Sequence, residues 1–239
     1  MITIKRIVIA CFVTVSFLSG QNEWALQPWV QVYGTMNGSR LGQEVHGLEK
    51  VTGDTTRIGV STFAETRIFY MKGQQDTVPR TYFPGRPVAL GDLNGDGTSD
   101  LVVGGNPTRV YLGTSDGSLD TIASFSKFGE AAGYAFGARI ATGNLNNDMY
   151  DDLIVSDAGY PNGQNAGRVY VFFGGSALDT LVDLSMTGDT SYVYLGWALA
   201  SGDLNNDGYD EIIARGYDNN HPTQAQKFGY VKIYSGGGV

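Results

Sequence analysis

Short apolar runs separated by glycine-rich polar stretches recur along the chain. Three of them follow the same kind of loop: Leu101-Val102-Val103, Leu153-Ile154-Val155 and Ile212-Ile213. Each run is followed, after a turn, by a second apolar or aromatic run, at 109–112, 169–173 and 230–234. Runs this short that are rich in β-branched and aromatic residues are typical of strands. No segment keeps a 3.6-residue period over a helical length, so the pattern predicts an all-β protein.

An oxygen-rich loop precedes each of the first runs. It reads GDLNGDGTSD from Gly91, GNLNNDMYDD from Gly143 and GDLNNDGYDE from Gly202, and we call these loops 1, 2 and 3. With the residue after the first glycine as position 1, side-chain oxygens stand at positions 1, 3, 5 and 9, and position 7 offers its backbone carbonyl. The expected ligands are Asp92, Asn94, Asp96, Thr98 and Asp100 in loop 1, Asn144, Asn146, Asp148, Tyr150 and Asp152 in loop 2, and Asp203, Asn205, Asp207, Tyr209 and Glu211 in loop 3.

Calcium is the ion that these loops suit best. It takes roughly 6–8 oxygens in a flexible geometry, whereas magnesium prefers a strict octahedron with fewer protein ligands. An EF-hand is excluded because it needs glutamate at position 12 and flanking helices, and position 12 here is Val103, Val155 and Ala214. Plain Asx turns would explain one copy through backbone geometry alone, but three copies with the same spaced oxygens favour ion binding.

Loop 2 departs from the other two. Met149 replaces the glycine at position 6, and Asn144 supplies a neutral oxygen at position 1. Fewer charged ligands and the loss of a residue suited to a left-handed backbone both weaken a calcium site. We therefore expect two to three structural Ca2+ sites, of which loop 2 is the weakest.

The repeat predicts the domain organisation. The loops begin about 50 to 60 residues apart, a spacing that suits one four-stranded β-propeller blade better than a helical repeat. An earlier copy at 51–62 keeps the strand but has lost the alternating oxygens, which predicts a blade without metal. We expect a lead-in segment at 21–39 and four blades within 40–239, at roughly 40–75, 85–118, 130–178 and 194–239.

Three of these motifs together resemble a known family. Phe136-Gly137, the Asp-x-Asn-x-Asp-Gly loops and the turn Ala158-Gly159-Tyr160-Pro161 are similar to the FG-GAP repeat of integrin α-subunit propellers and of many bacterial secreted proteins. The resemblance implies a β-propeller, usually of about seven blades, with Ca2+ held in loops on one face. Four blades are fewer, and a propeller closes so that no edge stays open. A fragment of a larger parent chain, a dimer that completes the ring and a small closed ring all remain open.

The first twenty residues have the pattern of a secretion signal. Lys5 and Arg6 precede an apolar run at 7–18, and Ser19-Gly20 supplies small residues for cleavage. The run is shorter than the roughly 20 residues of a membrane span. We therefore expect a signal peptide at 1–20, no integral membrane segment after its removal, and a secreted or cell-surface protein.

Catalytic motifs are missing from the sequence. His46 and His221 show no zinc-binding spacing, no Gly-x-Ser-x-Gly turn occurs, and the only cysteine, Cys11, lies in the predicted signal. A net charge of −8 argues against nucleic acid as a partner.

The function expected from these observations is a non-enzymatic, calcium-binding propeller that serves as a binding or adhesion module for a protein or a glycan. Two alternatives stand beside it. One is an accessory propeller of a secreted enzyme that acts on polysaccharide or phospholipid, with catalysis elsewhere. The other is a purely structural repeat of a large surface protein.

Overall fold

The computed structural model describes residues 7–10, 14–16, 25–27, 31–34, 44–50, 55–61, 65–72, 81–85, 88–130, 135–161, 164–218 and 228–237. All regular structure in these ranges is β-strand, which confirms the predicted fold class. No helix in them is long and apolar enough to cross a membrane. The chain divides into two compact units, Met1–Pro84 and Gly85–Val239. Lys5, Arg6, Cys11, Ser19-Gly20 and His221 lie outside the described residues.

Among its described residues, the first unit contains three antiparallel sheets. Strands β1 and β4 pair with each other, as do β2 and β3, and the third sheet has the order β5-β6-β7-β8. This third sheet, blade 1, contains the strands predicted for the copy without metal, and Ile68 and Phe83 are buried in it. The strands of the unit are β1 (Ile7–Ala10), β2 (Thr14–Ser16), β3 (Ala25–Gln27), β4 (Gln31–Gly34), β5 (Glu44–Lys50), β6 (Thr55–Ser61), β7 (Glu65–Lys72) and β8 (Thr81–Pro84).

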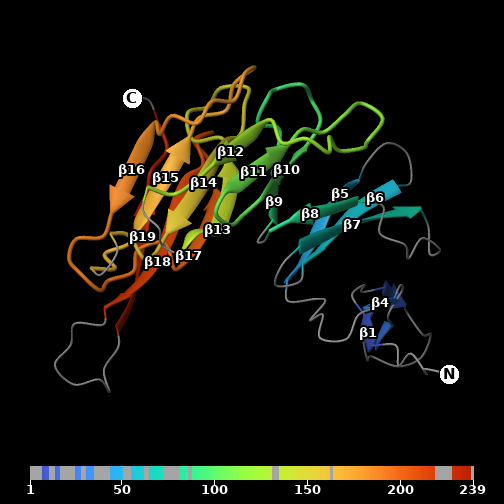
Figure 1. The fold of residues 1–239 in the computed structure, drawn as a ribbon, viewed down its shortest axis with the longest axis horizontal. Helices are drawn as coiled ribbons and strands as arrows, with labels where there is room; N and C mark the ends of the chain where they lie inside the picture. The colour runs from blue at the N-terminus through green and yellow to red at the C-terminus, as the bar shows by residue number, and fades with distance from the viewer. Residues whose placement is uncertain are drawn as a thin grey trace. The chain divides into compact units, whose positions relative to one another are not determined.

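The second unit contains three sheets in which consecutive strands pair (Figure 1). Blade 2 consists of β9 (Val88–Gly91), β10 (Asp100–Val103), β11 (Thr108–Tyr111) and β12 (Phe125–Lys127). Blade 3 consists of β13 (Phe136–Gly143), β14 (Asp152–Asp157), β15 (Arg168–Phe172) and β16 (Leu184–Thr187). Blade 4 consists of β17 (Ala198–Gly202), β18 (Glu211–Asp218) and β19 (Phe228–Tyr234). Every apolar run named from the sequence in this unit lies in or overlaps one of these strands.

The core of the second unit lies between the faces of successive blades. Leu93, Val102 and Phe125 of blade 2 pack against Leu153 and Tyr170 of blade 3 in one buried cluster. A second cluster joins blade 3 to blade 4 in the same way, through Ile154, Val169, Val171, Leu195, Ile212 and Ala214. Strand β14 is buried along its whole length because it has a cluster on each side. This explains why Leu153, Ile154 and Val155 in the strand form a continuous apolar run instead of alternating with polar residues.

The Phe-Gly motif fastens blade 3 to blade 2. Phe136 is buried and meets Tyr170 edge to face, with ring centroids 5.7 Å apart. Gly137 has a φ of 70°, and a Cβ there would collide with the Gly105 carbonyl of blade 2. The carbonyl of Gly137 accepts a 3.0 Å hydrogen bond from the Gly105 N–H. Only glycine allows both this conformation and this close approach.

Candidate metal-binding loops

The three loops occupy the same place in successive blades. Each connects the first strand of its blade to the second, and the pairs Gly91–Asp100, Gly143–Asp152 and Gly202–Glu211 close them. Strand β13 contacts both β9 and β17, so the three first strands lie side by side. The loops therefore stand together at one end of the blades, as the repeat predicted.

Within each loop, the oxygens at positions 1, 3 and 5 converge. The Asp96 N–H donates to both Asp92 Oδ1 and Asn94 Oδ1, at 3.1 Å in each case. Asp96 Oδ1 accepts the N–H of Thr98 at 2.8 Å. Loops 2 and 3 repeat these bonds through Asn144, Asn146, Asp148 and Tyr150, and through Asp203, Asn205, Asp207 and Tyr209. A shared N–H donor holds the oxygens of positions 1 and 3 next to each other.

Position 6 separates loop 2 from the others. Gly97 and Gly208 have φ values of 81° and 91°, and their N–H groups donate to the second oxygen of the position 1 carboxylate, at 2.8 and 3.0 Å. Met149 does not share this left-handed conformation. The amide nitrogen of Asn144 donates instead to the Asp148 carbonyl. Loop 2 thus has a different backbone at the residue where its sequence departs from the pattern.

The carboxylates at position 9 anchor the loops to the sheet. Asp100 is fully buried, and its oxygens accept the N–H groups of Leu93 and Gly113, both at 2.9 Å. Asp152 does the same for Leu145 and Gly174, at 2.8 and 3.0 Å. Burial raises the pKa of Asp100 and of Asp152 to about 6 in each case, against the opposing effect of the two N–H donors.

Glu211 resembles these aspartates in part. Its Oε2 accepts the Leu204 N–H at 2.8 Å, and its Oε1 lies 3.3 Å from the Asn205 amide nitrogen. In all three loops the carboxylate at position 9 therefore accepts the N–H of the leucine at position 2 and joins the two ends of the loop. This role was not predicted from the sequence. The second lone pairs of these carboxylates remain available to a cation.

The donor chemistry of each loop fits calcium. Carboxylate, amide and carbonyl oxygens are the groups this ion prefers, and positions 1, 3 and 5 already lie together. In the described part of the chain, however, no group of three or more Asp, Glu, His or Cys side chains gathers at metal-binding spacing. A site would therefore depend on the asparagine at position 3 and the carbonyl at position 7, as the sequence pattern predicted.

Aspartates at position 8 tie successive loops together, and the sequence analysis missed them. Asp151 Oδ2 accepts the Asp92 N–H at 2.8 Å, and the Asp151 N–H donates to the Asp92 carbonyl at 2.9 Å. Asp210 makes the same two bonds to Asn144, at 2.9 and 2.8 Å. The sequence did offer a signal for this contact. Loops 2 and 3 each end in two acidic residues, Asp151-Asp152 and Asp210-Glu211, and only the second residue of each pair belongs to the expected ligands.

Two further kinds of hydrogen bond, each made twice, complete this connection between blades. The N–H of Gly175 donates to the Leu93 carbonyl at 2.9 Å, and the N–H of Gly237 donates to the Leu145 carbonyl at 3.0 Å. The hydroxyls of Thr142 and Ser201 donate to the carbonyls of Leu90 and Thr142. Loops 1 and 2 are thus each held by the next blade through the same set of contacts.

The opposite end of blade 4 has an aromatic cluster, which we define as Tyr194, Trp197 and Tyr217. Tyr194 and Tyr217 stack with centroids 4.6 Å apart and planes 9° apart, and Trp197 meets Tyr217 edge-on at 5.2 Å. Trp197 is 44% exposed. It stands just before β17 and Tyr217 lies near the end of β18, so the cluster is at the far end of both strands from loop 3.

Comparison with known proteins identifies the repeat. Residues 92–155 match the model of the FG-GAP-like repeat, and residues 195–234 match that of the FG-GAP repeat. The chain therefore contains FG-GAP repeats. The all-β blades of the chain agree with a partial FG-GAP β-propeller.

Proteins with similar sequences include two integrin chains. Integrin alpha-5 of Xenopus laevis is 35% identical over 143 residues, which covers 55% of this chain and 13% of the integrin. Integrin alpha-8 of Mus musculus is 30% identical over 153 residues, or 58% and 14% of the two chains. Phosphatidylinositol-glycan-specific phospholipase D of Rattus norvegicus is 30% identical over 147 residues, or 53% and 17%. The matched segment is therefore a small part of each relative's length.

Proposed function

We propose that this FG-GAP protein is a secreted, calcium-stabilised binding or adhesion module for a protein or a glycan. The observation that carries the proposal is the chain of contacts from loop 1 to loop 3 through Asp151 and Asp210. A cation in one loop would order a loop that the next blade already holds, so ion binding would stiffen the stack of blades. An ion that binds only the folded state stabilises it by mass action.

The rigid loops leave the other end of the blades available for a partner. Exposed tryptophan and tyrosine side chains offer a large contact area with little loss of conformational entropy, which suits protein and glycan ligands. The aromatic cluster at Tyr194, Trp197 and Tyr217 has this chemistry. Because it is remote from loop 3, calcium in this proposal supports the binding surface without contacting the ligand.

The second candidate is an accessory propeller of a secreted enzyme that acts on phospholipid or polysaccharide. It is favoured by the similarity to phosphatidylinositol-glycan-specific phospholipase D. In that case the blades would position a substrate or a membrane surface for a catalytic segment outside them. A catalytic domain in the same reading frame would favour this candidate over an adhesion module.

The first test is thermal unfolding with Ca2+ and with a chelator, together with the mass in solution. We expect Ca2+ to raise the melting temperature by several degrees. Replacing Asp203 and Asp207 with alanine should remove far more of this rise than Asn144→Ala, because loop 3 has a charged ligand at position 1 and a left-handed glycine at position 6, and loop 2 has neither. Equal losses of the calcium-dependent rise would contradict the ranking of the loops. If calcium does not change the melting temperature, all three loops are ordinary turns that bind no ion.

A further inference from the structure

Loop 1 differs from loops 2 and 3 at position 4. Its asparagine at position 3 is followed by glycine, as Asn94-Gly95, whereas the other loops read Asn146-Asn147 and Asn205-Asn206. The three residues at position 4 all have a left-handed backbone, with φ values of 71°, 56° and 62°. The loops therefore share one backbone conformation at this point and differ in the side chain that follows the asparagine.

The glycine in loop 1 has a packing reason. A Cβ at Gly95 would lie 2.6 Å from Cε1 of Tyr150, a residue of loop 2 in the next blade. Carbon atoms that are not bonded prefer a separation of about 3.5–4.0 Å, so the contact between blades 2 and 3 leaves no room for a side chain after Asn94. The packing thus places next to Asn94 the residue that hinders its own backbone nitrogen least.

The side chain of Asn94 is folded back over the chain that follows it. Asn94 Oδ1 accepts the Asp96 N–H at 3.1 Å, and Asn94 Nδ2 donates to Asp96 Oδ2 at 2.8 Å. An asparagine oxygen bonded to the N–H two residues on forms an Asx turn, which brings the asparagine Cγ toward the intervening backbone nitrogen. The same N–H donor stabilises negative charge that develops on Oδ1 when this nitrogen attacks Cγ.

The Gly95 nitrogen is not engaged elsewhere. Its N–H donates no hydrogen bond to any of the residues that the structure describes. The equivalent N–H in loop 3 is held, because Asn206 donates to Asp203 Oδ1 at 2.6 Å. Loop 1 therefore has the less hindered nitrogen and also the one without a hydrogen-bond acceptor.

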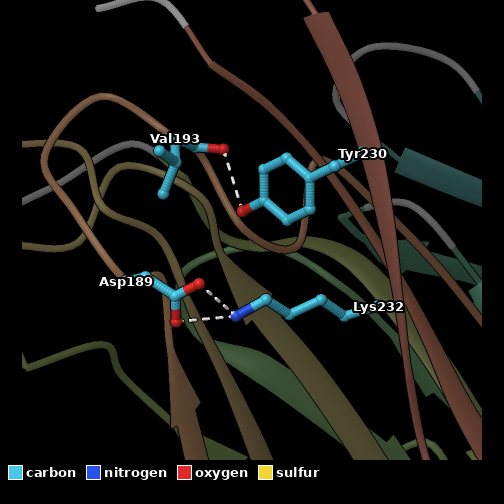
Figure 2. A network of polar contacts seen from close by, with 4 residues as sticks. All are labelled: Asp189, Val193, Tyr230 and Lys232. Carbon is cyan, nitrogen blue, oxygen red and sulfur yellow. Dashed lines mark hydrogen bonds and ion pairs between the residues drawn. The ribbon is translucent and has the colours of Figure 1, made fainter.

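Contacts from other strands do not hold the Asn94 side chain either. Within the described ranges, both of its hydrogen bonds go to Asp96, two residues away. The segment before β17 shows the contrast, because β19 holds it from outside: Lys232 Nζ lies 2.7 Å from Asp189 Oδ2 (Figure 2). The Asn94 amide can therefore turn toward the next nitrogen without breaking a contact to another strand.

We propose that Asn94 is the site of a spontaneous covalent modification, in which its side chain closes onto the Gly95 nitrogen. That nitrogen loses its proton to solvent and forms a bond to Asn94 Cγ. The Cγ–Nδ2 bond breaks, and the amide nitrogen takes up a proton from solvent and leaves as ammonia. Water then opens the resulting succinimide ring at either of its carbonyl carbons. The products are isoaspartate and aspartate at position 94, and the net reaction consumes water and releases ammonia.

The modification changes the loop in which it occurs. Isoaspartate has an additional methylene group in the main chain and a new negative charge, so the oxygen at position 3 no longer lies beside that of Asp92. Loop 1 then loses the arrangement that the proposed function assigns to calcium, whereas loops 2 and 3 keep it. The reaction itself needs no ion, so it can be tested separately from calcium binding.

The test is to incubate the folded full chain in chelator at mildly alkaline pH and to follow each asparagine by peptide mass spectrometry, with fragmentation to assign the site. We expect Asn94 to exchange its amide for a carboxyl group and to give isoaspartate and aspartate as separable products. Asn146 and Asn205 are controls in the same sample and should react at least about tenfold more slowly, because a Cβ on the next residue restricts the backbone. An unchanged Asn94, or equal rates at all three residues, would overturn the proposal.

Two further measurements separate the effect of the loop from that of the residue pair. Asn147→Gly places glycine after Asn146 in a loop with the same bonds to Asp148, and it should bring the rate at Asn146 close to that of Asn94. A rate that does not rise contradicts the role of position 4. In denaturant, where the Asx turn is lost, Asn94 should react no faster than in the folded chain. If Asn94 reacts only when the chain is unfolded, loop 1 protects it and the inference is wrong.

Discussion

At the scale of single residues, the aspartates at position 8, Asp151 and Asp210, connect each loop to the loop of the preceding blade. Asp151 is half-buried, and burial raises its pKa while the Asp92 N–H opposes that rise. Gly91 leaves room for it, since a Cβ at Gly91 would lie 2.8 Å from Asp151 Oδ2. The glycine before one loop and the aspartate of the next are therefore one structural unit, although they are far apart in the sequence.

Removing the Asp151 carboxylate should weaken the contact between blades 2 and 3. Asp151→Ala leaves the Asp92 N–H without its acceptor, and we expect a loss of about 1–3 kcal/mol in the free energy of unfolding, measured in chelator. Asp151→Asn keeps an accepting oxygen and should lose less. Asp116→Ala is the control, because Asp116 accepts hydrogen bonds only within an exposed turn. If Asp116→Ala and Asp151→Ala lower the free energy of unfolding equally, the hydrogen bond between the loops adds no more stability than one within an exposed turn.

At the scale of elements, the glycines after and within strands set how closely blades approach. Gly137 and Gly167 both have positive φ, and a Cβ on either would collide with backbone of an adjoining segment. Gly174 and Gly236 follow the third strands, and a Cβ there would meet the carbonyls of Asp151 and Asp210 in the same blade and those of Leu93 and Leu145 in the preceding blade. At these four positions glycine allows close backbone contact.

Gly137→Ala should be considerably more destabilising than a glycine replacement at an open position. The new methyl group meets the Gly105 backbone, which cannot move away as a flexible side chain would, and we expect a loss of at least about 2 kcal/mol. Gly97→Ala is the matched control, with a φ of 81° and nothing within 4 Å of the added Cβ. It should cost about 1 kcal/mol in chelator, through backbone strain alone. Denaturant unfolding of both variants separates collision from strain, and similar losses would contradict the role given to the Phe-Gly contact.

At the scale of the whole molecule, burial of a residue type depends on which blade holds it. The second unit stacks blades 2, 3 and 4 through two buried clusters, and the same loop leucine is buried in the first two blades and exposed in the third. The stability of the unit therefore resides largely between blades, as in other repeat proteins.

A pair of identical substitutions measures this difference. Leu145→Ala should lower the free energy of unfolding by about 2–5 kcal/mol, because it opens a cavity between blades 3 and 4. Leu204→Ala at the equivalent position should change it by less than about 1 kcal/mol, because Leu204 is largely exposed. Denaturant titration of the two variants gives the comparison directly. A comparable loss at Leu204 would mean that its side chain is covered in the monomer.

Much of the fold was predictable from the sequence because the repeat is local. The apolar runs at 101–103 and 153–155, the loops before them and the Phe-Gly motif each lie within one blade, and the structure confirms an all-β propeller of FG-GAP blades. The fourth strands β12 and β16 were missed. They are only three and four residues long, and they bury one side chain (Phe125) in β12 and none in β16, so they lack the alternation that marks a strand with a buried face.

Some features of the loops could likewise be predicted from the sequence, and others depend on the tertiary structure. Their oxygen spacing and the departure at Met149 are visible in the sequence, because hydrogen bonds between near neighbours and backbone conformation set them. Whether they bind calcium stays a prediction. The second role of Asp100 and Asp152 was not visible, since Gly113 and Gly174 come into contact with them only when the third strand pairs beside the second.

The sequence by itself determined the apolar strands, the repeat and the place of the loops, because each depends on residues close together in the chain. The tertiary structure decided which blade faces are covered, how Asp151 and Asp210 hold the preceding loops, and where Leu204, Val231 and Ile233 are left exposed. The physical reason is that these contacts join repeats that lie about one blade length apart in the chain. The same residue type is buried or exposed according to whether another blade lies against it.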